Sequence, residues 1–203
     1  MFKEILPSGM EGYHLTPTRE EAFTLLRKYN KDESHVKHAL AVEGTMRHFA
    51  RKFGGDEELW GIAGILHDID WEIAMDTPER HCNLAPDMLR EAGVDEHLIH
   101  AVQSHGWSIC TDVEPENDME KTLFAIDELT GLIITAGLVR PSKSLSDLEV
   151  KSVKKKWKDK AFAKGVNREI IQKGAELMGM PLDEVIENTI LALRPIEKEI
   201  GLG

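Results

Sequence analysis

Residues 57–70 read EELWGIAGILHDID, and this stretch decides the fold that we expect. Ala63, Gly64 and His67 fall on one face at helical spacing, and Asp56 just before the stretch is a common type of helix-capping residue. The two small residues on that face would let a second helix approach closely. The stretch therefore predicts a buried helix that ends in a histidine followed by an aspartate.

Helical patterns recur along the rest of the chain, whereas alternating strand-like runs are nearly absent. Thr18 with Glu21 resembles a capping box, and Gly54 with Gly55 is typical of a helix end. We therefore expect an all-α fold. The expected helices begin near Thr18 and at Asp56, and cover residues 32–54, 78–92, 95–104, 115–136, 167–178 and 182–193.

Composition narrows the class of protein further. The 203 residues are enough for one domain with a sizeable core, and the two cysteines, Cys82 and Cys110, have no CxxC spacing and predict no structural disulfide. A net charge of −11 argues against general adhesion to nucleic acid or membrane, so any affinity for a polyanion must be local. With no signal peptide and a longest apolar run of eleven residues, at 129–139, we expect a cytoplasmic protein.

Acidic and imidazole side chains occur where the helices should be buried. His38 shares a helical face with Ala41, Asp68 stands at the end of an apolar helix, and Asp127 is embedded in LFAIDELTGLII. An unpaired buried carboxylate costs several kcal/mol, and a divalent cation would neutralise it. Two imidazoles and two carboxylates suit a divalent transition metal with open water positions. The four candidate ligands are His38, His67, Asp68 and Asp127.

In order and helical context these four residues resemble the signature of the HD superfamily of metal-dependent phosphohydrolases. The resemblance covers roughly residues 30–140 and includes the His67-Asp68 doublet in GILHDID and Asp127 in FAIDELTG. It implies an HD-domain helical bundle in residues 1–140 that binds metal. The basic segment and the C-terminal helices, residues 141–203, are expected to pack on the same domain.

Two further histidines extend the likeness to HD proteins that hold two metals, such as the HD-type diadenosine tetraphosphate hydrolases. His81 in TPERHCNLA and His105 in AVQSHGWS occupy comparable places. The likeness implies that Asp68 bridges two ions about 3.5–4 Å apart. We accordingly expect one or two divalent ions, of Mn, Fe, Co, Ni or Zn.

The resemblance implies hydrolysis of a phosphate ester or anhydride by a metal-bound hydroxide. The chain has no GxSxG, GxxxxGK or GxGxxG motif, so covalent catalysis is not expected. Besides Asp68, Asp70 and Glu72 are the candidate catalytic carboxylates because they could relay a proton to or from the attacking water. The alternative for both is a solvated helix end.

Residues 140–160 carry eight Lys or Arg and three Asp or Glu. Arg140 and Lys143 lie nearest to Asp127 in sequence and are the expected phosphate contacts, although a solvated charge run is the alternative. A local basic patch on an acidic chain favours a small phosphorylated substrate, a nucleotide foremost, over long nucleic acid.

Two other functions remain open from the sequence. Some HD proteins with paired iron oxidise their substrates, and oxygen consumption would identify such an oxygenase. A non-catalytic nucleotide or metal sensor would instead bind without turnover, and its C-terminal helices would pass the signal to a partner. The sequence does not determine the oligomeric state.

Overall fold

The computed structural model describes residues 15–203, and this part of the chain is all-α with no named strand, as expected. The first 14 residues of the expected 1–140 core lie outside the described residues. The α-helices are α1 Arg19–Tyr29, α2 Glu33–Phe53, α3 Glu57–Leu66, α4 Trp71–Ala74, α5 Ala85–Ala92, α6 Glu96–Ser104, α7 Asp118–Leu138, α8 Val150–Trp157, α9 Arg168–Leu177 and α10 Leu182–Leu193. Two 3₁₀ turns are η2 Pro78–Arg80 and η3 Arg194–Ile196.

Local capping explains why several helices begin where the sequence predicts. Thr18 and Glu21 form the expected capping box before α1, and the carboxylates of Asp32 and Asp56 accept backbone amides at the starts of α2 and α3. Gly54 ends α2 in the left-handed region, with φ of 71°. These helix boundaries are confirmed.

The helix expected over residues 78–92 is interrupted, and that prediction is wrong. A 3₁₀ turn is followed by a non-helical stretch in which Cys82 has a φ of 61°, and α5 begins only at Ala85. The reason is a distant carboxylate, because Asp70 Oδ2 accepts the amides of Leu84 and Ala85 and so caps α5. Such a contact has no signature in the local sequence.

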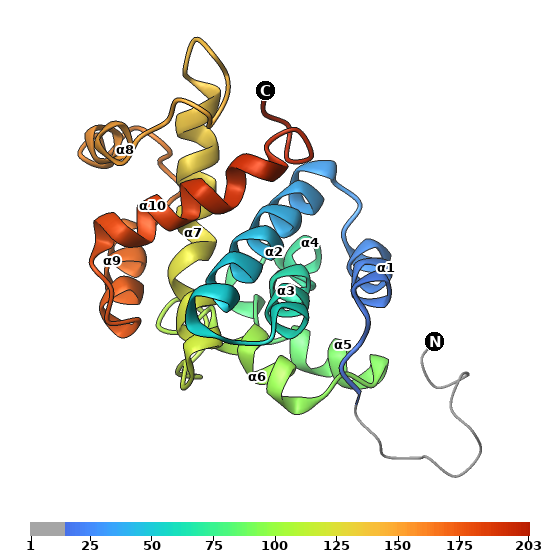
Figure 1. Cartoon of the computed structure of the whole chain (residues 1–203). Helices are drawn as coiled ribbons and strands as arrows, with labels where there is room; N and C mark the ends of the chain where they lie inside the picture. The colour runs from blue at the N-terminus through green and yellow to red at the C-terminus, as the bar shows by residue number, and fades with distance from the viewer. Residues whose placement is uncertain (1–14) are drawn as a thin grey trace.

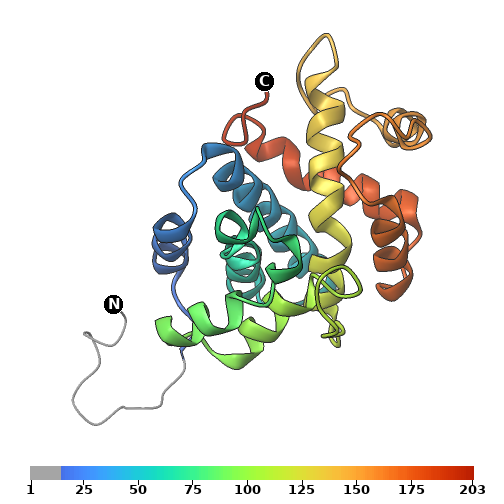
Figure 2. The same cartoon turned by 180° about the vertical axis from the view of Figure 1, so that it is seen from behind.

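Helices α2 and α7 form the centre of the molecule. α3 packs along α2, α1 covers α3, and α7 lies against the other side of α2 (Figures 1 and 2). The close approach of α2 and α3 depends on Gly64, because a Cβ at this position would lie 2.9 Å from the Glu43 backbone. The sequence-based expectation of a closely packed second helix at this small residue is confirmed.

The C-terminal helices contact the same central pair. α9 packs on α7 and α10 crosses both α2 and α7, with Ile171 and Val185 buried in the shared hydrophobic core (Figure 1). Among the described residues, no helix combines the length and the apolar character needed to cross a membrane.

Candidate metal centre

Three helices bring the first four candidate ligands together. His38 comes from the second turn of α2, His67 and Asp68 directly follow α3, and Asp127 comes from the middle of α7. The Nε2 atoms of His38 and His67 are 3.2 Å apart. Asp127 Oδ1 lies 2.9 Å from Nε2 of His38 and 3.4 Å from Nε2 of His67, and Asp68 Oδ2 lies 3.4 Å from Nε2 of His67.

The other oxygen of Asp68 faces a second pair of imidazoles. Asp68 Oδ1 is 3.3 Å from Nε2 of His81, in the turn after η2, and 3.5 Å from Nε2 of His105, which follows α6. Asp68 therefore lies at the centre of the six candidate metal ligands, with two imidazoles near each of its oxygens. This is the arrangement expected of a carboxylate between two cations.

The hydrogen bonds behind the imidazoles fit a metal-binding role. Nδ1 of His67 contacts the carbonyl of Gly64 at 2.7 Å, and Nδ1 of His105 contacts the carbonyl of Val102. Since a carbonyl only accepts, each Nδ1 carries a proton, so Nε2 is the nitrogen that each ring turns toward the cluster and can offer to a cation. Lone pairs and carboxylate oxygens that converge in this way form a donor set for a borderline divalent cation.

The cluster is strongly coupled electrostatically. Burial by itself would lower the pKa of His67, but Asp68 and Asp127 outweigh it and raise the pKa well above the usual histidine value. Burial likewise opposes ionisation of the two carboxylates, yet the surrounding imidazoles hold the pKa of Asp68 and of Asp127 well below the ordinary range. Both carboxylates are therefore ionised at neutral pH and attract positive charge.

Asp70 and Glu72, expected as proton relays, have other partners in the structure. Asp70 is fully buried, and its Oδ1 contacts Nδ1 of His81 at 2.8 Å. Burial lowers the pKa of His81, but the bond to Asp70 and the charge of Asp68 raise it to about 9. Glu72 accepts the backbone amides of Lys31 and Asp32 just before α2. Asp70 thus holds the ring of a candidate ligand, and Glu72 holds the backbone at the start of α2.

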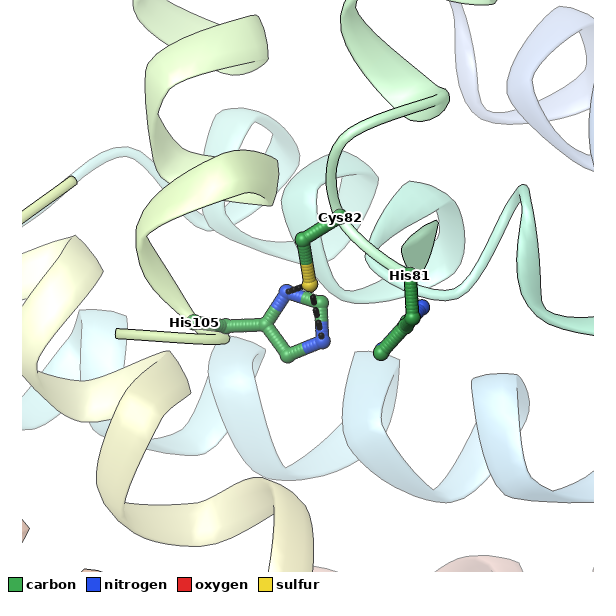
Figure 3. Close-up of side chains that lie close together, drawn as sticks. All are labelled: His81, Cys82 and His105. Atoms are coloured by element: carbon green, nitrogen blue, oxygen red, sulfur yellow. Dashed lines mark hydrogen bonds between the residues drawn. The ribbon is translucent and has the colours of Figure 1, made fainter. Parts of the chain in front are cut away.

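Cys82 is a neighbour of the cluster that the sequence did not assign to it (Figure 3). Its sulfur lies 3.7 Å from both ring nitrogens of His105. An atom equidistant from the two nitrogens is off the lone-pair direction of either, so this geometry does not suit a cation shared by the sulfur and Nε2. A hydrogen bond donated to the sulfur of Cys110, together with burial, raises the pKa of the Cys82 thiol, which is a packing group at this position.

The structure does not bring Arg140 and Lys143 to the cluster. Arg140 follows the end of α7, thirteen residues after Asp127, which corresponds to about 20 Å along a helix. Its guanidinium makes a two-point bond to the carboxylate of Asp147, at 2.9 and 2.7 Å. Both residues lie beyond the C-terminal end of α7, whereas Asp127 lies near its middle.

Sequence reasoning missed Glu128, which borders the cluster, and a contact between Trp107 and Lys173. Glu128 follows Asp127, and burial together with the Asp127 charge raises its pKa to about 7. Trp107 lies two residues after His105, and Nζ of Lys173 on α9 sits 3.3 Å from the centre of its ring. Lys173 and Trp107 lie far apart in the sequence, so no local pattern indicates their contact.

The fold and the site define a helical domain built around a His, His-Asp and Asp set that could hold a metal ion. The HD domain family model matches residues 36–155, and the chain belongs to this family. The resemblance noted from the sequence is thereby confirmed. No solved structure matches the chain.

Curated relatives include proteins named Ribonuclease Y. That of Oleidesulfovibrio alaskensis is 29% identical over 138 residues, which are 66% of this chain and 26% of the relative. That of Sulfurovum sp. is 27% identical over 163 residues, which are 77% of this chain and 31% of the relative. The chain thus spans less than a third of the length of these relatives.

Proposed function

We propose that this chain is a metal-dependent phosphohydrolase that acts on a phosphate ester or anhydride of a nucleotide. The observation that carries the proposal is the position of Asp68, whose two oxygens face separate imidazole groups. Membership of the HD domain family supports the reaction class. The relatives are named Ribonuclease Y, and the sequence favours a small nucleotide as substrate. Both arguments favour a substrate that is made of nucleotides.

The donor set fits two divalent transition-metal ions, which we propose as the cofactors. The side chains that would hold them are His38, His67 and Asp127 with Oδ2 of Asp68, and His81 and His105 with Oδ1 of Asp68. When bound, such ions lower the pKa of coordinated water to about 7 and offset the charge of phosphoryl oxygens. Asp70 orients the His81 ring, and the carbonyls of Gly64 and Val102 hold protons on Nδ1 of His67 and His105.

Metal content provides the first test. Elemental analysis of the purified protein should find transition metal in the wild type and a loss of most of it in Asp68→Ala. Asp147→Asn is a matched control because this exposed carboxylate bonds Arg140, away from the cluster. A folded wild type that binds no added Mn²⁺, Ni²⁺ or Co²⁺ would refute the proposal.

Product analysis provides the second test. Nucleoside monophosphates, cyclic nucleotides, dinucleotides and oligoribonucleotides should be incubated with the wild type and added Mn²⁺, Ni²⁺ or Co²⁺, and released phosphate and nucleotides measured. Asp127→Asn should lose most of the turnover. Oxygen consumption during turnover would instead identify an iron oxygenase, and binding without turnover across the whole panel would identify a sensor.

A further inference from the structure

Charge is distributed very unevenly along this chain. Residues 150–168, from the start of α8 to the first residue of α9, contain eight Lys or Arg and one Asp, a net charge of +7. The remaining residues together carry −18. An acidic surface repels a polyanion, so binding of one depends on residues 150–168, which we call the basic segment.

Much of the positive charge in the basic segment is not neutralised within the protein. Lys151 and Lys154 pair with Glu149 and Asp183, and Lys156 lies over the ring of Phe162. Four other lysines are exposed, and no carboxylate of residues 15–203 lies within ion-pair distance of them. These four free lysines are Lys155, Lys158, Lys160 and Lys164.

The backbone that presents the free lysines is held in a defined shape. The guanidinium of Arg168, at the start of α9, donates hydrogen bonds to four carbonyls of the preceding loop, at distances of 2.6–3.2 Å. These carbonyls belong to Trp157, Asp159, Phe162 and Val166. A loop tied at four points to one side chain is preorganised for binding, since less conformational entropy is lost when a ligand binds.

The basic segment ends beside the candidate metal centre. The amide of Asn167 donates to Oε2 of Glu128 at 3.2 Å, and Glu128 directly follows the candidate ligand Asp127. Lys164 precedes Asn167 by three residues, which span at most about 11 Å. Figure 2 shows the chain after α8 returning alongside α7 before α9 begins. The free lysines therefore lead from α8 toward the centre.

We infer that the basic segment binds successive phosphates of a single-stranded RNA and leads the strand to the metal centre. The inference rests on the proposed function, because it concerns the substrate of the same site. A free nucleotide carries its phosphates in one group, so it does not match cations that are spread over residues 155–164. A strand carries one phosphate per nucleotide and matches cations arranged in succession.

Salt dependence of binding tests the role of the lysines. Fluorescence anisotropy would measure the Kd of a fluorescein-labelled, phosphorothioate-linked 12-nucleotide RNA between 50 and 200 mM KCl. Each lysine that contacts a phosphate of a single strand contributes about 0.7 to the slope of log K against log salt. In the triple variant K158A/K160A/K164A, the magnitude of this slope should therefore be smaller by about 2.

A matched triple variant controls for net charge. Lys28, Lys52 and Lys198 are exposed and lie outside the basic segment, so their replacement by Ala should leave the slope unchanged. Equal slopes for the wild type and the basic-segment variant would overturn the inference. ATP would be measured as a competitor of the RNA. If ATP bound with the same affinity and the same salt slope as the RNA, the inference would also be overturned, because the protein would then not distinguish a strand from a single nucleotide.

Arg168→Lys tests whether the ordered loop matters. Lysine keeps the charge but lacks the planar fork of donors that reaches several carbonyls at once. With helical content unchanged by circular dichroism, the Kd of the 12-nucleotide RNA should rise about tenfold, the equivalent of 1.4 kcal/mol. An unchanged Kd would overturn the role of the loop.

A small phosphodiester separates this inference from the proposed function. The wild type should hydrolyse bis(p-nitrophenyl) phosphate with Mn²⁺, since this substrate needs the metal centre and has no strand. Hydrolysis without salt-dependent RNA binding would overturn the inference alone. RNA binding without hydrolysis of any phosphate ester would overturn the proposed function and leave the RNA-binding surface.

Discussion

Asp70 and His81 are joined by a hydrogen bond of 2.8 Å between Oδ1 and Nδ1. The other oxygen of Asp70 accepts the amides of Leu84 and Ala85, at 3.2 and 3.0 Å. One buried carboxylate thus fixes both the ring of a candidate ligand and the turn that carries it. A carboxylate that accepts the far N–H of an imidazole in this way fixes the orientation in which the ring meets a metal ion.

Asp70→Asn should weaken binding of the ion next to His81. The amide group of asparagine offers one oxygen in place of two, so it cannot accept the ring and both backbone amides as before. We expect a loss of about 10- to 100-fold in affinity for one of two Mn²⁺ ions, measured by titration calorimetry. Asp87→Asn, a change at an exposed carboxylate of α5, is the control. Unchanged affinity for both ions would contradict the role of Asp70.

Metal should stabilise the fold. An ion that binds only the folded state adds about 2.7 kcal/mol at a concentration 100 times its Kd. Addition of Mn²⁺ should therefore raise the Tm of the wild type, and a chelator should reverse the rise. Asp127→Asn should lose most of this Mn²⁺-dependent rise, whereas Asp147→Asn should retain it. A rise of the same size in Asp127→Asn would argue that the ion binds elsewhere.

The sequence predicted those parts of the fold that depend on local interactions. Caps at Thr18, Asp32 and Asp56 involve residues within one turn of the helix, so their pattern is visible in the chain. Ligand candidates could also be identified, because His38 and Asp127 stand out as polar side chains on apolar faces. The distance of 2.9 Å between His38 Nε2 and Asp127 Oδ1 depends on how α2 packs against α7, and only the structure shows that packing.

What the sequence could not predict depends on distant partners. The turn at Cys82 is held by Asp70, and the positions of Asp70 and Glu72 are set by residues that they contact across the fold. Arg140 is near Asp127 in sequence, but the second half of α7 separates the two residues, and Arg140 pairs with Asp147 beyond the end of the helix. Proximity along a helix therefore does not by itself place a side chain at the cluster.

Gly64→Ala should destabilise the protein, because the added methyl group would meet the backbone of Glu43 on α2, which cannot move without separating the helices. We expect a cost of about 1–3 kcal/mol. Gly131→Ala on α7 is the matched control, since a Cβ there meets nothing within 4 Å. It should stabilise by about 0.5–1 kcal/mol. Urea unfolding of both variants would measure the difference, and equal effects would contradict the close packing at Gly64.

Glu72→Gln should reduce stability more at neutral pH than in acid. Burial opposes ionisation of Glu72, but the amides of Lys31 and Asp32 and the ring of His35 lower its pKa below the usual glutamate value. A carboxylate with a lowered pKa in the folded state stabilises the protein above its unfolded-state pKa, and this contribution is lost as the pH falls through the folded-state pKa. We therefore expect a loss of about 1 kcal/mol at pH 7 and a smaller loss at about pH 3.5, which is below the ordinary glutamate pKa. Urea unfolding at both pH values, with a chelator present throughout and exposed Glu79→Gln as the control, would measure it. An equal loss at the two pH values would show that the charge of Glu72 does not stabilise the start of α2.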